Sequence, residues 1–346
     1  MITTLLMVGG GLLLLFAGGE MLVRGAVGVA RRLGLSELII GLTLVGFGTS
    51  VPELVTSLRA VETDAVGIAV GNVTGSNIAN VFLVLGVAAL LTPIVTHPAA
   101  LWRDCSFMVL VTAVFAALVW LDLFTRPVGL AMVAVLVGFV VLSIILDLRS
   151  GSAVAQMHAD EGASVETRDP LILALILALV GIAAVIFGAR LLVDGSVVLA
   201  RMAGLSETVI GLTIVAMGTS LPELVTSAMS ALRGKSDVAL GNIVGSNIFN
   251  ILGILGITAL VSPFSTLVPQ PAARSPLSAD GGQQGMVEVP IVSWEDMGAL
   301  ILSVGLLILF AFTGRRIARW EGLVFLGCYA VYMGLLFDLL PTPLSL

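Results

Sequence analysis

The sequence predicts an all-α membrane protein with ten transmembrane helices, arranged as two inverted five-helix repeats whose helices break near the middle of the membrane. Composition is the first observation behind this prediction: of 346 residues, 58% are hydrophobic and 11% are charged. A soluble domain carries about 25% charged residues, and it has no way to bury so much apolar surface. The second observation is a long segment, residues 34–93, that recurs at 204–263.

Ten apolar runs follow one another along the chain, and a bilayer core requires about 20 mostly apolar residues per helix. The first run has no basic residues before it and is longer than the apolar part of a signal peptide, so we interpret it as a retained span. The predicted spans are 3–30, 36–61, 66–91, 101–122, 127–147, 171–200, 206–232, 237–262, 294–313 and 318–340.

Two polar segments divide the chain. The segment 148–170 separates a first five-helix half, 1–147, from a second half, 171–346, and we interpret it as a linker. The segment at about 264–293 is rich in Pro, Gly, Ser and Gln, and its composition predicts an irregular loop. The two cysteines lie far apart in sequence and indicate neither a disulfide framework nor a metal site.

The distribution of basic residues predicts the orientation, because Arg and Lys concentrate in cytoplasmic loops. If the N-terminus faces outward, ten basic residues lie in inner loops and three in outer loops. We therefore expect both termini outside and the 148–170 linker in the cytoplasm. The inner set is Arg31, Arg32, Arg103, Arg149, Arg168, Arg233, Lys235, Arg315, Arg316 and Arg319, and the outer set is Arg126, Arg201 and Arg274.

The repeat aligns without a gap at a constant offset of 170 residues. "GLSELIIGLTLVGFGTSVPELVTS" aligns with "GLSETVIGLTIVAMGTSLPELVTS", and "GNVTGSNIAN" aligns with "GNIVGSNIFN". Because each half holds five spans, an odd number, the second copy enters the membrane from the opposite side. Inverted repeats of this kind build many secondary transporters, whose sites lie near the midplane where broken helices meet.

Each copy has a glutamate directly after a proline, Glu53 after Pro52 and Glu223 after Pro222. A charge at the centre of the bilayer costs at least roughly 2.5–3.5 kcal/mol. Two carboxylates facing each other there require a cation between them, unless a buried base such as Arg59 pairs with one of them. The pattern therefore predicts a cation site at the repeated motif.

The turn before each proline supplies further oxygen atoms. Proline has no N–H and disfavours the hydrogen bond to the carbonyl four residues earlier, so we expect the helix to break and carbonyls near Gly48 and Gly218 to be free for an ion. Hydroxyl groups lie in the same turn. The candidate residues are Gly46, Gly48, Thr49 and Ser50 in the first copy and Ala216, Gly218, Thr219 and Ser220 in the second.

The second motif of each copy adds polar residues to one helix face. Ser76 and Asn80 are four residues apart, as are Ser246 and Asn250, so each pair lies on one side of a helix. The other asparagines, Asn72, Asn77, Asn242 and Asn247, are expected to hydrogen-bond the broken backbones rather than bind an ion. The glycines Gly71, Gly75, Gly241 and Gly245 have a spacing that allows close helix approach.

Hard oxygen ligands favour Na⁺, Ca²⁺ or Mg²⁺ over softer metals. Two carboxylates balance one Ca²⁺ or two Na⁺, and Ca²⁺ accepts six to eight oxygens in flexible geometry, whereas Mg²⁺ demands near-octahedral order. A site shared between two repeats therefore suits Ca²⁺ better than Mg²⁺. One anionic centre that either ion neutralises, but not both together, is a physical basis for exchange.

The two motifs, "GTSxPELVTS" and "GNxxGSNIxN", present twice along the chain, resemble the two repeats of prokaryotic members of the sodium/calcium exchanger family, within the calcium:cation antiporters. The resemblance implies ten helices, a prokaryotic plasma or inner membrane, and Na⁺ influx that drives Ca²⁺ efflux as the first and sixth helices slide past the others. By position, it implies that Glu53, Glu223 and the carbonyls of Thr49 and Thr219 hold Ca²⁺. It implies that Na⁺ uses the same glutamates with Gly46, Ser50, Ser76, Ala216, Ser220 and Ser246, and that Asn80 and Asn250 line the centre.

One departure from the family pattern leaves details open. Some members carry Asp at the position of Asn80 or Asn250, whereas both are Asn in this sequence. The missing third carboxylate leaves open the Na⁺:Ca²⁺ stoichiometry and any use of K⁺ or H⁺.

Three other functions remain as alternatives at this point. A Ca²⁺/H⁺ exchanger and a passive cation channel are compatible with a shared acidic centre. A membrane enzyme requires a nucleophile–base pair or an acidic dyad, and only the pair Glu53 and Glu223 keeps that alternative open. Both histidines, His97 and His158, fall in predicted loops. We expect no enzymatic activity, cofactor, nucleic acid or obligate protein partner; the expected partners are Ca²⁺, Na⁺ and the lipid bilayer.

Overall fold

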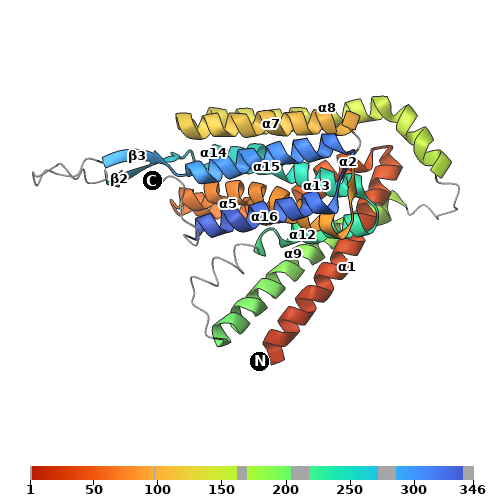
Figure 1. Ribbon diagram of the computed structural model, residues 1–346, viewed down its shortest axis with the longest axis horizontal. Helices are drawn as coiled ribbons and strands as arrows, with labels where there is room; N and C mark the ends of the chain where they lie inside the picture. Colours follow the sequence, from red (N-terminus) through yellow and green to blue (C-terminus); the bar gives the residue numbers. More distant parts are fainter. Residues whose placement is uncertain (1, 97, 162–169, 204–217, 272–285, 338–346) are drawn as a thin grey trace, which may run out of the picture.

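The computed structural model describes residues 2–96, 98–161, 170–203, 218–271 and 286–337, which are mostly helical (Figure 1). The first half contains α1 Ile2–Leu33, α2 Glu37–Ile40, η1 Gly41–Val45, α3 Gly46–Thr49, α4 Val51–Glu62, α5 Val66–Ala79, η2 Asn80–Leu85, α6 Gly86–Leu91, β1 Ile94–Val95, α7 Pro98–Leu121 and α8 Arg126–Glu161. The second contains α9 Leu171–Met202, α12 Leu221–Leu232, α13 Ser236–Ile248, η4 Phe249–Leu255, α14 Gly256–Val261, β2 Leu267–Pro271, β3 Met286–Pro290, α15 Trp294–Thr313, β4 Arg316–Ile317 and α16 Arg319–Leu336. The η elements are π-helical turns.

Seven helices in the described part of the chain are long and apolar enough to cross a bilayer. They are Ile2–Leu33, Val66–Leu91, Leu101–Leu121, Arg126–Arg149, Leu171–Met202, Ser236–Val261 and Trp294–Thr313. An eighth candidate is the bent pair Glu37–Thr49 and Val51–Glu62. Of the two remaining predicted spans, 318–340 contains helix α16 but ends outside the described residues, and 206–232 contains α12 but begins outside them.

The helix break lies at Ser50, where α3 ends and α4 begins at an angle of 44°. Pro52 stands in the first turn of α4, where its missing N–H costs nothing because that N–H has no partner within the helix. The second copy has the same local geometry: Ser220 has φ −86° and ψ 2°, against −86° and 10° for Ser50. The repeated proline therefore starts a new helix in both copies.

Helices α1 and α9 lie side by side and are inclined to the other helices (Figure 1). Glycines spaced seven residues apart bring their backbones together; a Cβ atom added to Gly25, for example, would lie 2.7 Å from the carbonyl oxygen of Ala174. The contact is antiparallel and extends over most of both helices. The glycines are Gly11, Gly18 and Gly25 on α1 and Gly181, Gly188 and Gly195 on α9.

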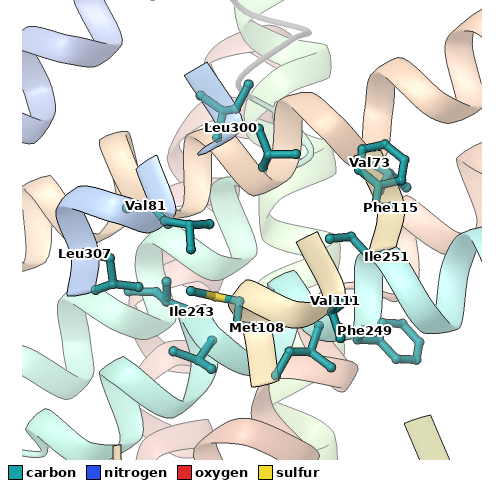
Figure 2. Packing of buried hydrophobic residues seen from close by; sticks show 14 of the residues in the cluster. Val73, Val81, Met108, Val111, Phe115, Ile243, Phe249, Ile251, Leu300 and Leu307 are labelled. Carbon is teal, nitrogen blue, oxygen red and sulfur yellow. The ribbon is translucent and has the colours of Figure 1, made fainter. Parts of the chain in front are cut away.

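The centre of the protein is formed by α5–η2–α6 and α13–η4–α14, which are largely buried, whereas α1, α8 and α9 leave many of their apolar residues exposed, as lipid-facing helices do. Figure 2 shows part of this core, where Met108 of α7 packs near Val81 and Ile243. Gly241 and Gly245 let α13 cross α2 and η1 so closely that a Cβ atom would overlap the backbone of the crossing segment. No described atom lies within 4 Å of a Cβ atom built on Gly71 or Gly75.

All four tryptophans are 59–63% exposed and lie near helix ends. Trp102 and Trp120 are 18 residues apart on α7, which corresponds to about 27 Å along a helix. Trp120 and Trp294 contact each other with ring centroids 4.8 Å apart. Tryptophans concentrate at the two interfaces of a membrane, so this spacing is that of two aromatic belts separated by the hydrocarbon core.

Two segments differ from the sequence-based expectation. Helix α8 continues to Glu161, well into the segment 148–170 that we interpret as a linker, and the sequence from Arg149 to Glu161 contains no proline to stop the helix. The ends of the predicted irregular loop at 264–293 form an antiparallel pair, β2 with β3, and the valines on these strands favour extended structure. A shorter antiparallel pair joins β1 to β4.

Candidate cation site

Two buried glutamates lie at the helix breaks. Glu53 and Glu223 are each 1% exposed. Ser50 Oγ donates a hydrogen bond to Glu223 Oε1 at 3.0 Å, so a residue of the first copy contacts the carboxylate of the second. Among the described residues, Arg59 makes no ion pair with Glu53, and Oε2 of Glu53 has no hydrogen-bond partner. The structure therefore does not support Arg59 as the base that neutralises Glu53.

Nine buried side-chain oxygens have no hydrogen-bond partner among the described residues, and four of them belong to candidate site residues. These four are Oε2 of Glu53, Oε2 of Glu223, Oδ1 of Asn80 and Oδ1 of Asn250. They form two pairs related by the 170-residue offset of the repeat. An unpaired buried acceptor costs about 1–3 kcal/mol, and more if it is charged. Four such oxygens, two of them from carboxylates, form a set of ligands suited to a hard cation.

A second asparagine in each copy holds the helix that carries the glutamate. Asn72 Nδ2 donates to the carbonyl oxygen of Glu53 at 3.2 Å and to Ser57 Oγ at 3.1 Å. Asn242 Nδ2 makes the equivalent bonds, to the carbonyl oxygen of Glu223 at 3.3 Å and to Ser227 Oγ at 2.8 Å. The expectation that these asparagines bond the broken backbones is confirmed. The serines were missed, although the repeated "ELVTS" contains both of them.

Some of the hydroxyl groups near the break already make hydrogen bonds to other groups of the protein. Thr49 Oγ1 lies 3.1 Å from the carbonyl oxygen of Val45 and 3.2 Å from Asn242 Oδ1, so this hydroxyl has acceptors on both repeats. Ser246 Oγ donates to the carbonyl oxygen of Gly46 at 3.1 Å. The carbonyl of Gly46, which we expected to be free, therefore already accepts a hydroxyl proton in this structure, as well as the N–H of Ser50.

Three of the remaining candidates line a cavity. Ser76 and Ser220 are buried, Thr219 is half-buried, and all three line a cavity of about 580 Å³ between α5, α16 and the start of α12. Gly48 and Gly218 contact side chains of α9, Ile182 and Val193 respectively. Pro222 is buried and Pro52 is half-buried. Ala216 lies outside the described residues.

The asparagines of the second motif also contact each other across the repeats. Asn80 Nδ2 donates to Asn247 Oδ1 at 3.0 Å, and Asn250 Nδ2 donates to Asn77 Oδ1 at 2.9 Å. Sequence reasoning assigned Asn77 and Asn247 to the backbone and missed their contact with the site residues. The two asparagines are visible in the repeated "GSN", but the contact depends on how α5 crosses α13.

Charged residues on the membrane helices pair between elements. Glu20 of α1 forms an ion pair with Arg233 after α12. Lys235 Nζ, two residues further on, lies 2.8 Å from Glu37 Oε1 of α2. The turn between α12 and α13 is thus joined to both α1 and α2.

Broken helices that bring unpaired carboxylate and amide oxygens together in a buried centre define a multi-pass membrane protein of the cation-transporter class. The profile of the family described as sodium/calcium exchanger protein matches residues 3–145 and 173–337. The chain therefore belongs to the sodium/calcium exchanger family, whose members are cation antiporters.

Similar proteins agree with this assignment. The chain is 33% identical over 370 aligned positions to sodium/calcium exchanger MaX1 of Methanosarcina acetivorans, covering 94% of this chain and 96% of that protein. It is 37% identical over 270 positions to inner membrane protein YrbG of Escherichia coli, covering 75% and 80%. Among solved structures, it is similar to the sodium-calcium exchanger NCX_Mj soaked with 2.5 mM Na⁺ and 0.1 mM Ca²⁺, with a TM-score of 0.76, 30% identity, and coverage of 96% of this chain and 98% of that one.

Proposed function

We propose that this protein is a secondary antiporter that exchanges Na⁺ for Ca²⁺ across the membrane by alternating access, moves net charge, and exports Ca²⁺. The observation that carries the proposal is the set of four unpaired buried oxygens on Glu53, Glu223, Asn80 and Asn250. Two buried carboxylates, each with an oxygen that lacks a donor, require about two positive charges, which one Ca²⁺ or two Na⁺ supply. Because both ions need the same carboxylates, each displaces the other.

The ligands follow from the two copies of the motif. Glu53 and Glu223 bind either ion, and the carbonyl groups of Thr49 and Thr219 complete the Ca²⁺ site. Asn80 and Asn250 line the centre with amide oxygens. The Na⁺ ligands are the two glutamates together with Gly46, Ser50, Ser76, Ala216, Ser220 and Ser246. The hydrogen bond from Ser50 to Glu223 supports a centre built jointly from both copies.

The architecture in this proposal is ten transmembrane helices in two inverted repeats, 1–147 and 171–346. Hydrogen bonds that recur at an offset of 170 residues support it, as do the two separate matches to the family profile. Helices α1 and α9, which correspond to the first and sixth spans, move together past the broken helices. Their backbone contact through glycines supports movement as one unit.

The orientation in this proposal has both termini outside and the 148–170 segment in the cytoplasm of a prokaryotic cell, with the protein in its plasma or inner membrane. The excess of Arg and Lys in the loops assigned to the inner side supports it. Alkaline phosphatase fused after residue 346 should be active outside the cytoplasm, and a fusion within 148–170 should be inactive. The reverse pattern would require the opposite orientation.

The function is tested by ⁴⁵Ca²⁺ uptake into proteoliposomes loaded with Na⁺, K⁺ or choline, with the membrane voltage clamped or free. Exchange predicts uptake that requires internal Na⁺ and changes with voltage. Uptake that is indifferent to internal cations would indicate a channel, and uptake that requires a proton gradient would indicate a Ca²⁺/H⁺ exchanger. Either result would overturn the proposed coupling to Na⁺.

A further inference from the structure

A cluster of four asparagines that bond one another lies where α5 and η2 meet α13 and η4. Asn77 Nδ2 donates to the backbone carbonyl of Asn247 at 3.2 Å, and Asn247 Nδ2 donates to the backbone carbonyl of Asn77 at 3.4 Å. Asn80 and Asn250 join this asparagine cluster through their amide nitrogens, as described above. All four side chains are buried. The cluster is nearly symmetric, since each bond recurs with the roles of the two repeats exchanged.

The chemistry of these groups allows one arrangement of the four amides. A backbone carbonyl only accepts hydrogen bonds, so the carbonyls of Asn77 and Asn247 must each meet the nitrogen of the opposite side chain. That requirement directs Oδ1 of Asn77 toward Asn250 and Oδ1 of Asn247 toward Asn80. An amide oxygen also only accepts hydrogen bonds. Asn250 must therefore direct its Nδ2 toward Oδ1 of Asn77, and Asn80 must direct its Nδ2 toward Oδ1 of Asn247.

The outcome is that Oδ1 of Asn80 and Oδ1 of Asn250 point away from the asparagine cluster, and these are the two amide oxygens without a donor. If either amide turned over, two oxygens would face each other in the cluster, and an N–H₂ group would take the place of the unpaired oxygen. A cation is attracted to an amide oxygen and repelled by the N–H₂ side. The orientation of these two amides therefore decides whether they bind the ion.

We propose that Asn77 and Asn247 are positioning residues that hold the amide oxygens of Asn250 and Asn80, respectively, toward the transported cation. This inference rests on the proposed function, because it takes the centre that includes Glu53 and Glu223 as the ion site. Neither Asn77 nor Asn247 touches the ion. Each acts through the site residue of the other repeat, so the pairing is crossed: Asn77 with Asn250, and Asn247 with Asn80.

Removing a positioning residue should weaken ion binding without stopping transport. In Asn77→Ala the Asn250 amide loses its acceptor and turns freely, and a neutral hydrogen bond of this kind corresponds to about a tenfold change in an equilibrium constant. We expect the KM for Ca²⁺ and for Na⁺ to rise about tenfold, with a smaller change in maximal rate. Asn247→Ala should do the same through Asn80.

Double variants separate positioning from general damage to the fold. If Asn77 acts through Asn250, then Asn77→Ala should raise KM little or not at all in an Asn250→Ala background. In an Asn80→Ala background, the same change should raise KM by the same factor as it does in the wild type. Asn247→Ala should show the opposite pattern. A loss of fold stability has no reason to follow these crossed pairs. Thr112→Val is the control, because among the described residues the buried Thr112 hydroxyl bonds only to Met108 of its own helix; its KM should equal that of the wild type.

The measurements are KM values for ⁴⁵Ca²⁺ uptake in proteoliposomes and Ca²⁺ titration calorimetry in detergent. If Asn77→Ala fails to insert, Asn77→Gln replaces it, since Gln keeps a buried amide but moves its oxygen away from Asn250. Equal effects of the Asn77 change in both backgrounds, or unchanged KM values in an active exchanger, would overturn the inference alone. A wild-type protein that binds neither Ca²⁺ nor Na⁺ would overturn the proposed function and, with it, the inference.

Discussion

Ser50 of the first repeat donates a hydrogen bond to Glu223 of the second, with 3.0 Å between Oγ and Oε1. Both residues are buried, with Ser50 0% exposed and Glu223 1% exposed. The two helix breaks therefore meet, and the carboxylate of one repeat is oriented by a hydroxyl of the other. A centre of this kind depends on both copies of the motif, so changes in either copy should affect the binding of both ions.

Neutralising either glutamate should abolish Ca²⁺ transport. Glu53→Gln and Glu223→Gln keep the shape of the side chain but remove one of the two charges that balance the cation. Loss of one partner from a buried charged pair costs about 3–5 kcal/mol, which lowers affinity by more than about a hundredfold. The measurement is ⁴⁵Ca²⁺ uptake together with size-exclusion chromatography to verify folding.

Glu62→Gln is the matched control, because Glu62 is an exposed carboxylate at the end of the same helix as Glu53, α4. It should transport at the wild-type rate. Full activity in Glu53→Gln or Glu223→Gln would show that the carboxylates are not the cation ligands.

Removal of the Ser50 hydroxyl should weaken binding less than removal of a charge. A hydrogen bond to a charged group contributes about 1.5–3 kcal/mol, so Ser50→Ala should raise the KM for Na⁺ by at least about tenfold. Thr313→Val, which removes an exposed hydroxyl bonded within its own helix, is the control. Na⁺-dependence curves of Ca²⁺ uptake provide the comparison, and identical curves for the two variants would contradict the role given to Ser50.

Asn250→Asp should make transport depend on pH in a defined direction. When the introduced carboxyl group is protonated, its O–H donates to Asn77 Oδ1, as the Asn250 amide does now at 2.9 Å. When that group is ionised, two oxygens face each other and the centre gains a third negative charge. We therefore expect the variant to resemble the wild type at low pH and to diverge from it as pH rises. The measurement is ⁴⁵Ca²⁺ uptake across a pH series, and a difference from the wild type that is constant across pH would contradict this account.

The α1–α9 contact should tolerate no added methyl group at its glycines. A Cβ atom on Gly25 would lie 2.7 Å from the Ala174 carbonyl oxygen, closer than real side chains come. Overpacking of this kind costs about 1–3 kcal/mol, so Gly25→Ala should lower the melting temperature in detergent and reduce transport. Gly10→Ala on the same helix has no neighbour within 4 Å among the described atoms and should leave both unchanged. Equal melting temperatures would show that the two helices are not in direct backbone contact.

The ion pair between Lys235 and Glu37 should make a small contribution to stability. Its side chains are 28% and 17% exposed and its atoms are 2.8 Å apart, and partly exposed pairs contribute about 0.2–1 kcal/mol. Lys235→Glu should lower the melting temperature, and the double variant Glu37→Lys with Lys235→Glu should restore part of it. The same decrease in the single and double variants would indicate that the pair contributes nothing.

Several features of the site were predictable because they are local in sequence. A proline has no N–H wherever it occurs, so the breaks at Ser50 and Ser220 follow from Pro52 and Pro222. A buried carboxylate in a lipid environment needs a counter-charge, which made the two repeated glutamates candidates before any fold was known. The exact offset of 170 residues also predicted which residues have equivalent surroundings, and the hydrogen bonds of the asparagines at 72 and 242 follow it.

Contacts between distant helices were not predictable in the same way. The bond from Asn250 to Asn77 joins residues 173 positions apart, and it exists because η4 packs against α5 in the folded protein. The ion pair of Glu20 with Arg233 depends likewise on where α1 meets α12. The glycines at seven-residue intervals on α1 and α9 were a visible signal for a helix contact, but a spacing alone does not name the partner helix.

Composition and the repeat were thus sufficient for the membrane environment, the family resemblance and the acidic residues, because hydropathy, backbone chemistry and internal identity are properties of the chain itself. The roles of Asn77 and Asn247, and the direction in which the amides of Asn80 and Asn250 point, required the folded protein. Hydrogen-bond direction depends on which donor meets which acceptor, and that is settled when the two halves of the chain come together.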